Sequence, residues 1–232
     1  MHRETVSYPA NGDRASGHLA VPDAKGPHPG VVVIQEYWGL EPHIKDVAGR
    51  FTEHGFIALA PDLYHGKIAR EPDEAMKLAM ELDLPRAIKD ITGAARYLIG
   101  RSDVQPKKLG VIGFCMGGRL ALAFGAQTDL AGAIAAFYPG GYRPTVDEAK
   151  QVKAPILVHF GEEDHSLPEE ARAHIERTFR AAGRPLETHI YMGAPHAFFN
   201  DTKPSHRPDS ARQAWDRTIA WFSQHLKGAP VG

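Results

Sequence analysis

Residues 109–118 read Leu-Gly-Val-Ile-Gly-Phe-Cys-Met-Gly-Gly, an apolar run that ends in the pattern G-x-C-x-G-G. This pattern predicts a buried strand that turns sharply into a helix, with Cys115 at the turn. Glycines two positions before and two after the cysteine let the strand and the helix approach each other. The helix then points the partial positive charge of its N-terminus at the thiol, which favours a thiolate and an oxyanion. Cys115 is therefore predicted to be a nucleophile; the competing interpretation is a buried core cysteine, the commoner state of a lone Cys.

Similar apolar runs recur along the chain and alternate with helical patterns. The other runs are Val31–Ile34, Phe56–Ala60, Ala133–Phe137, Ile156–Phe160 and Thr188–Tyr191. The helical patterns cover Ile44–His54, Asp73–Ile99 with a break near Pro85, Gly118–Ala126, Pro168–Ala182 and Ser210–Leu226. A hairpin is expected ahead of them, with Thr5–Tyr8 and Ser16–Val21 flanking an Asn-Gly-Asp turn. Together with the cysteine turn, this alternation predicts the α/β-hydrolase fold: a mainly parallel twisted sheet with helices on both faces.

Composition limits the class of protein. With 232 residues, 43% of them hydrophobic, the chain suits one domain spanning residues 1–232. A net charge of -1 without a basic block argues against a nucleic-acid partner. No apolar run is long enough for a membrane span or a signal peptide, so we expect a cytoplasmic protein, a monomer or weak dimer. The single cysteine excludes an internal disulfide, and the 13 histidines form no HExxH pattern, so no metal or cofactor is expected.

Ligands of a parallel sheet bind at the carboxyl ends of its strands, so the residues that follow each run are the candidates for chemistry. Asp164 follows one such run in a G-x-x-D-x-x-L-P loop, where a triad acid is expected. The alternatives are that Asp164 only shapes the turn before the helix, or that Glu162 or Glu163 is the triad acid instead. His196 follows the last run on a Gly/Pro loop and would serve as general base and acid; the alternative is a surface histidine. The order Cys, Asp, His along the chain is the order that this fold requires.

The loop Gln35-Glu36-Tyr37-Trp38-Gly39 follows the first of the apolar runs after the hairpin. In the predicted fold this loop supplies one amide of the oxyanion hole, and the residue after the nucleophile supplies the other. The two donors would be the backbone N–H groups of Tyr37 and Met116. Glu36 would then be a carboxylate near the thiol, or else an exposed loop residue, as Glu commonly is.

Five motifs give the chain a resemblance to the dienelactone hydrolases (carboxymethylenebutenolidases), which are α/β-hydrolases. They are QEYWGL at 35–40, PDLY at 61–64, GFCMGG at 113–118, GEEDHSLP at 161–168 and APHAF at 194–198. The resemblance spans nearly the whole chain. It implies a nucleophilic Cys115 with His196 and Asp164 as its triad partners, and the same two oxyanion amides. It also implies that Glu36 interacts with the resting thiol and helps to deprotonate it when substrate arrives.

The chain departs from this family where substrate binds. Dienelactone-type members hold a substrate carboxylate with two arginines. The position four residues after the histidine is Asn200 here, and Arg70 is the nearest candidate for the other arginine. Asn cannot replace a bidentate guanidinium. Trp38, Arg70 and Asn200 are the candidate substrate-binding residues; Lys67 and Lys203 could supply charge, or they could be solvated surface cations.

The sequence thus predicts a hydrolase that opens a lactone or activated ester through a Cys-His-Asp triad and a thioester acyl-enzyme. One alternative is a general small-molecule carboxylesterase or thioesterase without dienelactone activity. Another is a non-catalytic α/β-hydrolase that binds a small ligand.

Overall fold

The computed structural model describes residues 1–184 and 186–227, so residue 232, the expected end of the domain, lies outside the described residues. Within these ranges eight strands form one sheet in the order β1-β2-β4-β3-β5-β6-β7-β8. The strands are β1 His2–Ala10, β2 Asp13–Val21, β3 Gly30–Ile34, β4 Ile57–Pro61, β5 Leu109–Phe114, β6 Ala131–Phe137, β7 Ile156–Gly161 and β8 Leu186–Tyr191. The helices are α1 Pro42–Glu53, α2 Pro72–Glu81, α3 Leu84–Gly100, α4 Met116–Gln127, α5 Val146–Gln151, α6 Glu169–Ala181 and α7 Pro208–Leu226.

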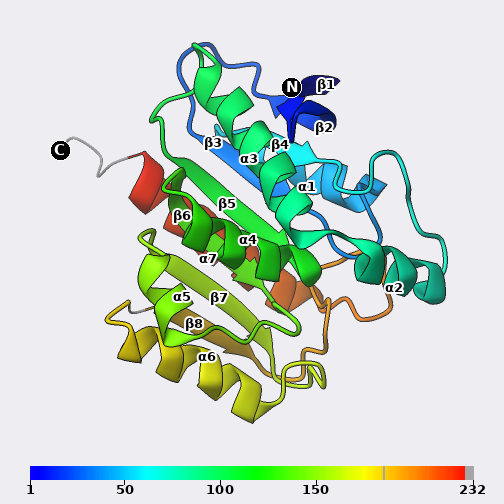
Figure 1. Ribbon diagram of the computed structural model, residues 1–232, viewed down its shortest axis with the longest axis vertical. Coiled ribbons are helices and arrows are strands. Elements are labelled where there is room, and N and C mark those ends of the chain that lie inside the picture. Colours follow the sequence, from blue (N-terminus) through cyan, green and yellow to red (C-terminus); the bar gives the residue numbers. More distant parts are fainter. Residues whose placement is uncertain (185, 228–232) are drawn as a thin grey trace.

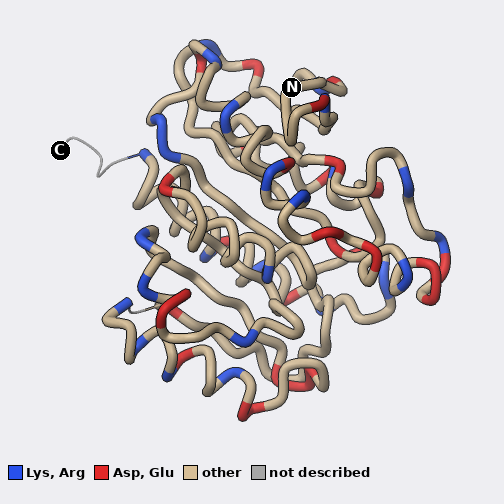
Figure 2. Tube along the Cα trace, in the orientation of Figure 1, with Lys and Arg blue, Asp and Glu red and all other residues tan. Residues whose placement is uncertain are grey.

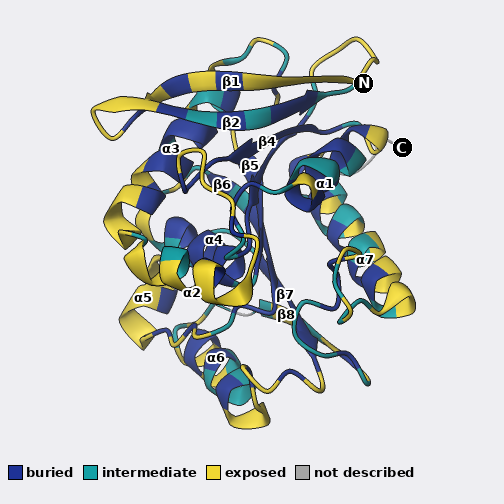
Figure 3. Ribbon diagram, turned by 90° about the vertical axis from the view of Figure 1, so that its right-hand side faces the viewer, coloured by how far each residue is buried: buried dark blue, intermediate teal, exposed yellow. Residues whose placement is uncertain are grey.

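The sheet is parallel from β4 to β8, and the hairpin of β1 and β2 joins it antiparallel through β4 (Figure 1). Helices α1 and α7 cover one face, and α3, α4, α5 and α6 cover the other (Figure 3). The central strands β3, β4 and β5 are buried along their whole length, which explains why their sequences do not alternate between apolar and polar residues. These observations confirm the predicted fold class.

Charged residues of both signs are interspersed over the helices, the loops and the outer strands β1, β2 and β8, and they are absent from the central strands β3, β4 and β5 (Figure 2). The long helical pattern predicted over residues 73–99 is two helices, α2 and α3. The second begins where the break was predicted, with Asp83 accepting a hydrogen bond from the Arg86 amide at 2.8 Å. Helix α5 was not predicted. A capping box between Thr145 and Glu148 starts this short helix, and the local pattern is too short to reveal a helical period.

The turn from β5 into α4 packs against the end of β3. A Cβ atom at Gly117 would lie 2.4 Å from the carbonyl oxygen of Gln35, so only glycine allows this approach. The first turn of α4 and the loop after β3 therefore lie in direct contact. This contact places the segment after β3 beside Cys115.

Candidate active site

Cys115 lies between β5 and α4 in a strained conformation. Its φ of 55° falls in the left-handed region, which non-glycine residues rarely adopt. Its amide donates a hydrogen bond to the Phe137 carbonyl at 3.0 Å, and its own carbonyl accepts hydrogen bonds from the Gly118 and Arg119 amides. The side chain is half-buried and lines a cavity. The turn therefore holds the thiol at the cavity instead of in the apolar core.

Asp164 and His196 come together from the loops after β7 and β8. The His196 ring Nδ1 lies 2.7 Å from Asp164 Oδ2, and the aspartate is buried. The rival carboxylate Glu162 instead accepts a hydrogen bond from the Gly193 amide at 2.9 Å. Ser166, which the sequence reasoning missed, donates to Asp164 Oδ1 from its hydroxyl at 2.6 Å and from its amide at 2.9 Å.

The charges of these groups favour an ionised imidazole. Burial alone would lower the pKa of His196, but hydrogen bonds with the Asp164 carboxylate and the Cys115 thiol raise it to about 10. Burial would likewise raise the pKa of Asp164, whereas the hydrogen bonds from His196 and Ser166 hold it below its ordinary value. Asp164 is therefore an anion that holds the imidazole and stabilises its positive charge.

Two backbone amides are available beside the thiol. Met116 is the first residue of α4, and Tyr37 lies in the turn after β3; both residues line the same cavity as Cys115. Neither amide donates a hydrogen bond to another protein group among the described residues. A helix N-terminus leaves such groups free to bind an anion.

Glu36 is buried directly after β3. Its Oε2 accepts a hydrogen bond from Asn200 Nδ2 at 2.7 Å, and its Oε1 accepts one from the Tyr138 hydroxyl at 3.3 Å. Asn200 Oδ1 accepts from the amide and the hydroxyl of Thr202, at 3.0 and 2.6 Å, which fixes its Nδ2 toward Glu36. Burial raises the pKa of Glu36, and the Asn200 hydrogen bond opposes this effect. Glu36 is thus a buried carboxylate, not an exposed loop residue.

The cavity in front of these groups has a volume of about 460 Å³ and a mostly apolar wall. Besides Cys115 and His196 it is lined by Tyr37, Trp38, Met76, Ala79, Met116, Arg119, Gly140, Ser166, Ala197, Lys203 and Ser205. Of the three candidate substrate-binding residues, Trp38 lies in the cavity wall.

The other two candidate substrate-binding residues lie elsewhere. Asn200 is fully buried behind Glu36 and is not part of the wall, because Glu36 and Thr202 occupy its amide. Arg70 is exposed outside the cavity, beside the start of α2. The fold places the cation Lys203 in the cavity wall, with its Nζ 3.6 Å from the centre of the Trp38 ring. Arg119 also lines the cavity; its spacing of four residues from Cys115, one helical turn, was a signal that could have found it.

The parallel sheet, the strained turn before α4 and the His–Asp pair at the strand ends define an α/β-hydrolase. The family model described as "Dienelactone hydrolase family" matches residues 15–226. The chain therefore belongs to the dienelactone hydrolase family, and it is a hydrolase that acts on esters or lactones.

Similarities to individual proteins support this assignment. The chain is 35% identical to "Protein usf" of Aquifex pyrophilus, over 96% of this chain and 99% of that one. It is 33% identical to a Yersinia pestis protein named "Putative carboxymethylenebutenolidase", over 97% of this chain and 89% of that one. Among solved structures, one titled "Putative Dienelactone Hydrolase" from Klebsiella pneumoniae superimposes with a TM-score of 0.87 at 28% identity, covering 97% of this chain and all of its own.

Two further properties concern membranes and metals. No helix in residues 1–184 and 186–227 is both long enough and apolar enough to span a bilayer. The same residues contain no group of three or more His, Cys, Asp or Glu side chains arranged to hold a metal ion.

Proposed function

We propose that this protein hydrolyses a lactone or an activated carboxylic ester with Cys115 as nucleophile, His196 as acid and base, and Asp164 as the group that orients the histidine. The observation that carries the proposal is the 2.7 Å contact between Asp164 and His196, together with the position of His196 and Cys115 in the wall of one cavity. The raised pKa of His196 favours an imidazolium next to the nucleophile, which can then donate a proton to the leaving oxygen.

Acylation begins when the Cys115 sulfur attacks the carbonyl carbon. A carbon–sulfur bond forms, and the electron pair of the carbonyl moves onto its oxygen. The Tyr37 and Met116 amides stabilise that oxyanion. The intermediate collapses to a thioester as the bond to the leaving oxygen breaks. That oxygen takes a proton from the His196 imidazolium; in a lactone it stays on the same molecule.

Deacylation reverses the role of the histidine. Neutral His196 takes a proton from water while the water oxygen attacks the thioester. The carbon–sulfur bond breaks, and the acid leaves as the thiolate and imidazolium are restored. Because a thiolate is itself a good leaving group, an intermediate with a poor alcohol leaving group reverts. The proposed substrates are therefore activated esters such as enol lactones.

Glu36 completes the proposed site as a buried proton acceptor for the thiol. Burial raises its pKa, which favours uptake of a proton, and its oxygens already accept hydrogen bonds from Asn200 and Tyr138. We propose that it receives the thiol proton when a neutral Cys115 meets substrate, and that it returns this proton to the thiolate after the acid has left. Its burial, with only 1% of the residue exposed, keeps that proton within the site.

The test is the Cys115→Ala variant assayed with p-nitrophenyl acetate, together with time-dependent alkylation of the wild-type thiol by iodoacetamide. Turnover should fall to the background rate in the variant, because the proposed acylation step needs the Cys115 sulfur to attack the carbonyl carbon. Unchanged turnover would contradict the assignment. Rapid alkylation of a wild-type protein that turns over no ester would favour a ligand-binding role instead.

A general carboxylesterase without dienelactone activity is the second candidate. The observation that favours it is the position of Asn200 and Arg70 outside the cavity wall, which leaves no guanidinium at the places where the family resemblance expects a carboxylate clamp. The test compares kcat/KM for a dienelactone with kcat/KM for a neutral activated ester. A dienelactone hydrolase should prefer the dienelactone, and a general carboxylesterase should not.

A further inference from the structure

The motif Pro61-Asp62-Leu63-Tyr64 has no part in the proposed chemistry, although it lies close to it. It forms the turn that leaves β4 toward α2, and the Asp62 carboxylate closes this turn by accepting hydrogen bonds from the Tyr64 amide at 3.1 Å and the Gly66 amide at 2.6 Å. His65 and Gly66 adopt left-handed conformations, with φ of 51° and 93°. Such a conformation costs free energy at a histidine and persists only where its surroundings hold it.

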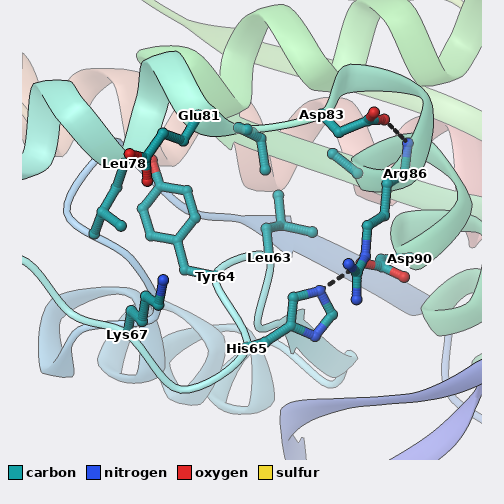
Figure 4. A pocket seen from close by; sticks show the side chains of 11 residues that line it. Leu63, Tyr64, His65, Lys67, Leu78, Glu81, Asp83, Arg86 and Asp90 are labelled. Carbon is teal, nitrogen blue, oxygen red and sulfur yellow. Dashed lines mark hydrogen bonds and ion pairs between the residues drawn. The ribbon is translucent and has the colours of Figure 1, made fainter.

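The turn is also fastened to helix α3. The His65 ring Nε2 lies 3.1 Å from Asp90 Oδ2, and the Asp90 side chain is only 3% exposed. A buried carboxylate needs such a partner. The pair lies at one side of a second cavity of about 230 Å³, which Tyr64, Leu63 and Arg86 also line (Figure 4).

From this fixed turn, two contacts reach the two halves of the proposed oxyanion hole. The Leu63 amide donates a hydrogen bond to Gln35 Oε1 at 3.2 Å, and Gln35 lies two residues before Tyr37. The buried Tyr64 hydroxyl lies 3.6 Å from Met116 Sδ. A thioether is a weak acceptor, so this contact acts on the position of Met116 more than on its charge.

We propose that Tyr64 is a positioning residue that sets the spacing between the Tyr37 and Met116 amides. This inference rests on the proposed function. Two donors stabilise an oxyanion only when both lie about 2.7–3.1 Å from the same oxygen. These two come from the ends of different strands, β3 and β5, and the Asp62–Gly66 turn contacts both of their segments. Tyr64 also borders the second cavity, so a loosened turn has open space behind it (Figure 4).

The Tyr64→Phe variant tests this role because it keeps the ring and removes only the hydroxyl. Deleting an oxyanion donor costs about 10²–10³ in kcat, so displacing one should lower kcat for p-nitrophenyl acetate about tenfold, with KM within about twofold. The affinity for an aldehyde that forms a tetrahedral adduct with Cys115 should fall by the same factor. Alkylation of Cys115 by iodoacetamide should keep its rate, because displacement of iodide creates no oxyanion.

The matched control is Tyr8→Phe. Tyr8 is also buried and donates its hydroxyl to the Ser16 carbonyl at 3.1 Å; that carbonyl keeps its 2.9 Å hydrogen bond from the Asp62 amide when the Tyr8 hydroxyl is removed. This variant should lose stability and keep the wild-type kcat. A second variant, Asp62→Asn, loosens the turn without touching Met116 and should lower kcat in the same selective way.

Three results would overturn the inference: a Tyr64→Phe kcat within about twofold of wild type, an alkylation rate that falls as far as kcat, or an equal loss of kcat in Tyr8→Phe. Failure of the proposed function would look different. Ester turnover would then survive Cys115→Ala, and the oxyanion assignment would fall with it.

Discussion

Gly117 is where helix α4 comes closest to the end of β3. A Cβ atom there would lie 2.4 Å from the Gln35 carbonyl oxygen and 2.5 Å from the Ile34 carbonyl oxygen. Both obstacles are backbone atoms and cannot rotate away. The Gly117→Ala variant must therefore separate the two segments by at least about 0.6 Å to restore the 3.0 Å that real Cβ atoms keep.

This separation acts on the proposed oxyanion hole. Tyr37 lies two residues after Gln35 on one segment, and Met116 lies one residue before Gly117 on the other. A misplacement of about 1 Å can cost about 10² in rate, so kcat/KM for p-nitrophenyl acetate should fall about 10- to 100-fold. Overpacking should cost about 1–3 kcal/mol in the free energy of unfolding, which urea denaturation measures. The variant should remain folded and lose most of its activity.

Gly125→Ala, in the same helix, is the matched control. A Cβ atom at Gly125 would lie 2.4 Å from Ile134 Cδ1, the end of a flexible side chain in the core. This variant should lose a similar amount of stability and keep kcat/KM. The reasoning would be refuted if Gly117→Ala kept kcat/KM within about threefold of wild type, or if both variants lost it equally.

Two further predictions concern the charges of the site. Asp164→Asn should let the pKa of His196 fall from about 10 toward 6.5. In wild type the raised pKa adds stability that is full below about pH 6.5 and is lost as the pH rises to about 10, and the variant should lack this contribution. Urea denaturation at about pH 6, 8 and 10 measures it, and an unchanged pH dependence would contradict the His196–Asp164 pairing. Lys203→Met should raise KM about tenfold for an activated ester that carries a free carboxylate and leave KM for a neutral ester unchanged. Lys67→Met, outside this cavity, is the control, and equal effects on both esters would refute a role for the Lys203 charge.

The fold was predictable because its signals are local. Apolar β-branched runs with helical patterns between them specify parallel strands, and the two glycines around Cys115 specify a close strand-to-helix turn. The same logic placed Asp164 and His196 at strand ends, since the carboxyl ends of parallel strands meet at one edge of the sheet. The observed sheet confirms the fold class, and the family match confirms the resemblance. Helix α5 was missed because six residues are too few to show a helical period.

Which side chains line the cavity depends on contacts between residues far apart in the sequence. The spacing of Asn200 from His196 suggested a place in the binding site, yet its amide turns inward to Glu36, 164 residues away along the chain. Lys203 looked like an ordinary surface cation until the fold placed it over Trp38. Likewise, nothing near Tyr64 in the sequence indicates that it reaches Met116.

By itself the sequence determined the class of this protein, the strained turn at Cys115 and the strand ends that carry Asp164 and His196. These features follow from residue type, period and order along one chain. Only the tertiary structure decided that Glu36 is buried against Asn200, that Lys203 and Arg119 line the cavity, and that Leu63 and Tyr64 contact Gln35 and Met116. The physical reason is that packing between separate strands sets which way these side chains point, and no local pattern encodes that direction.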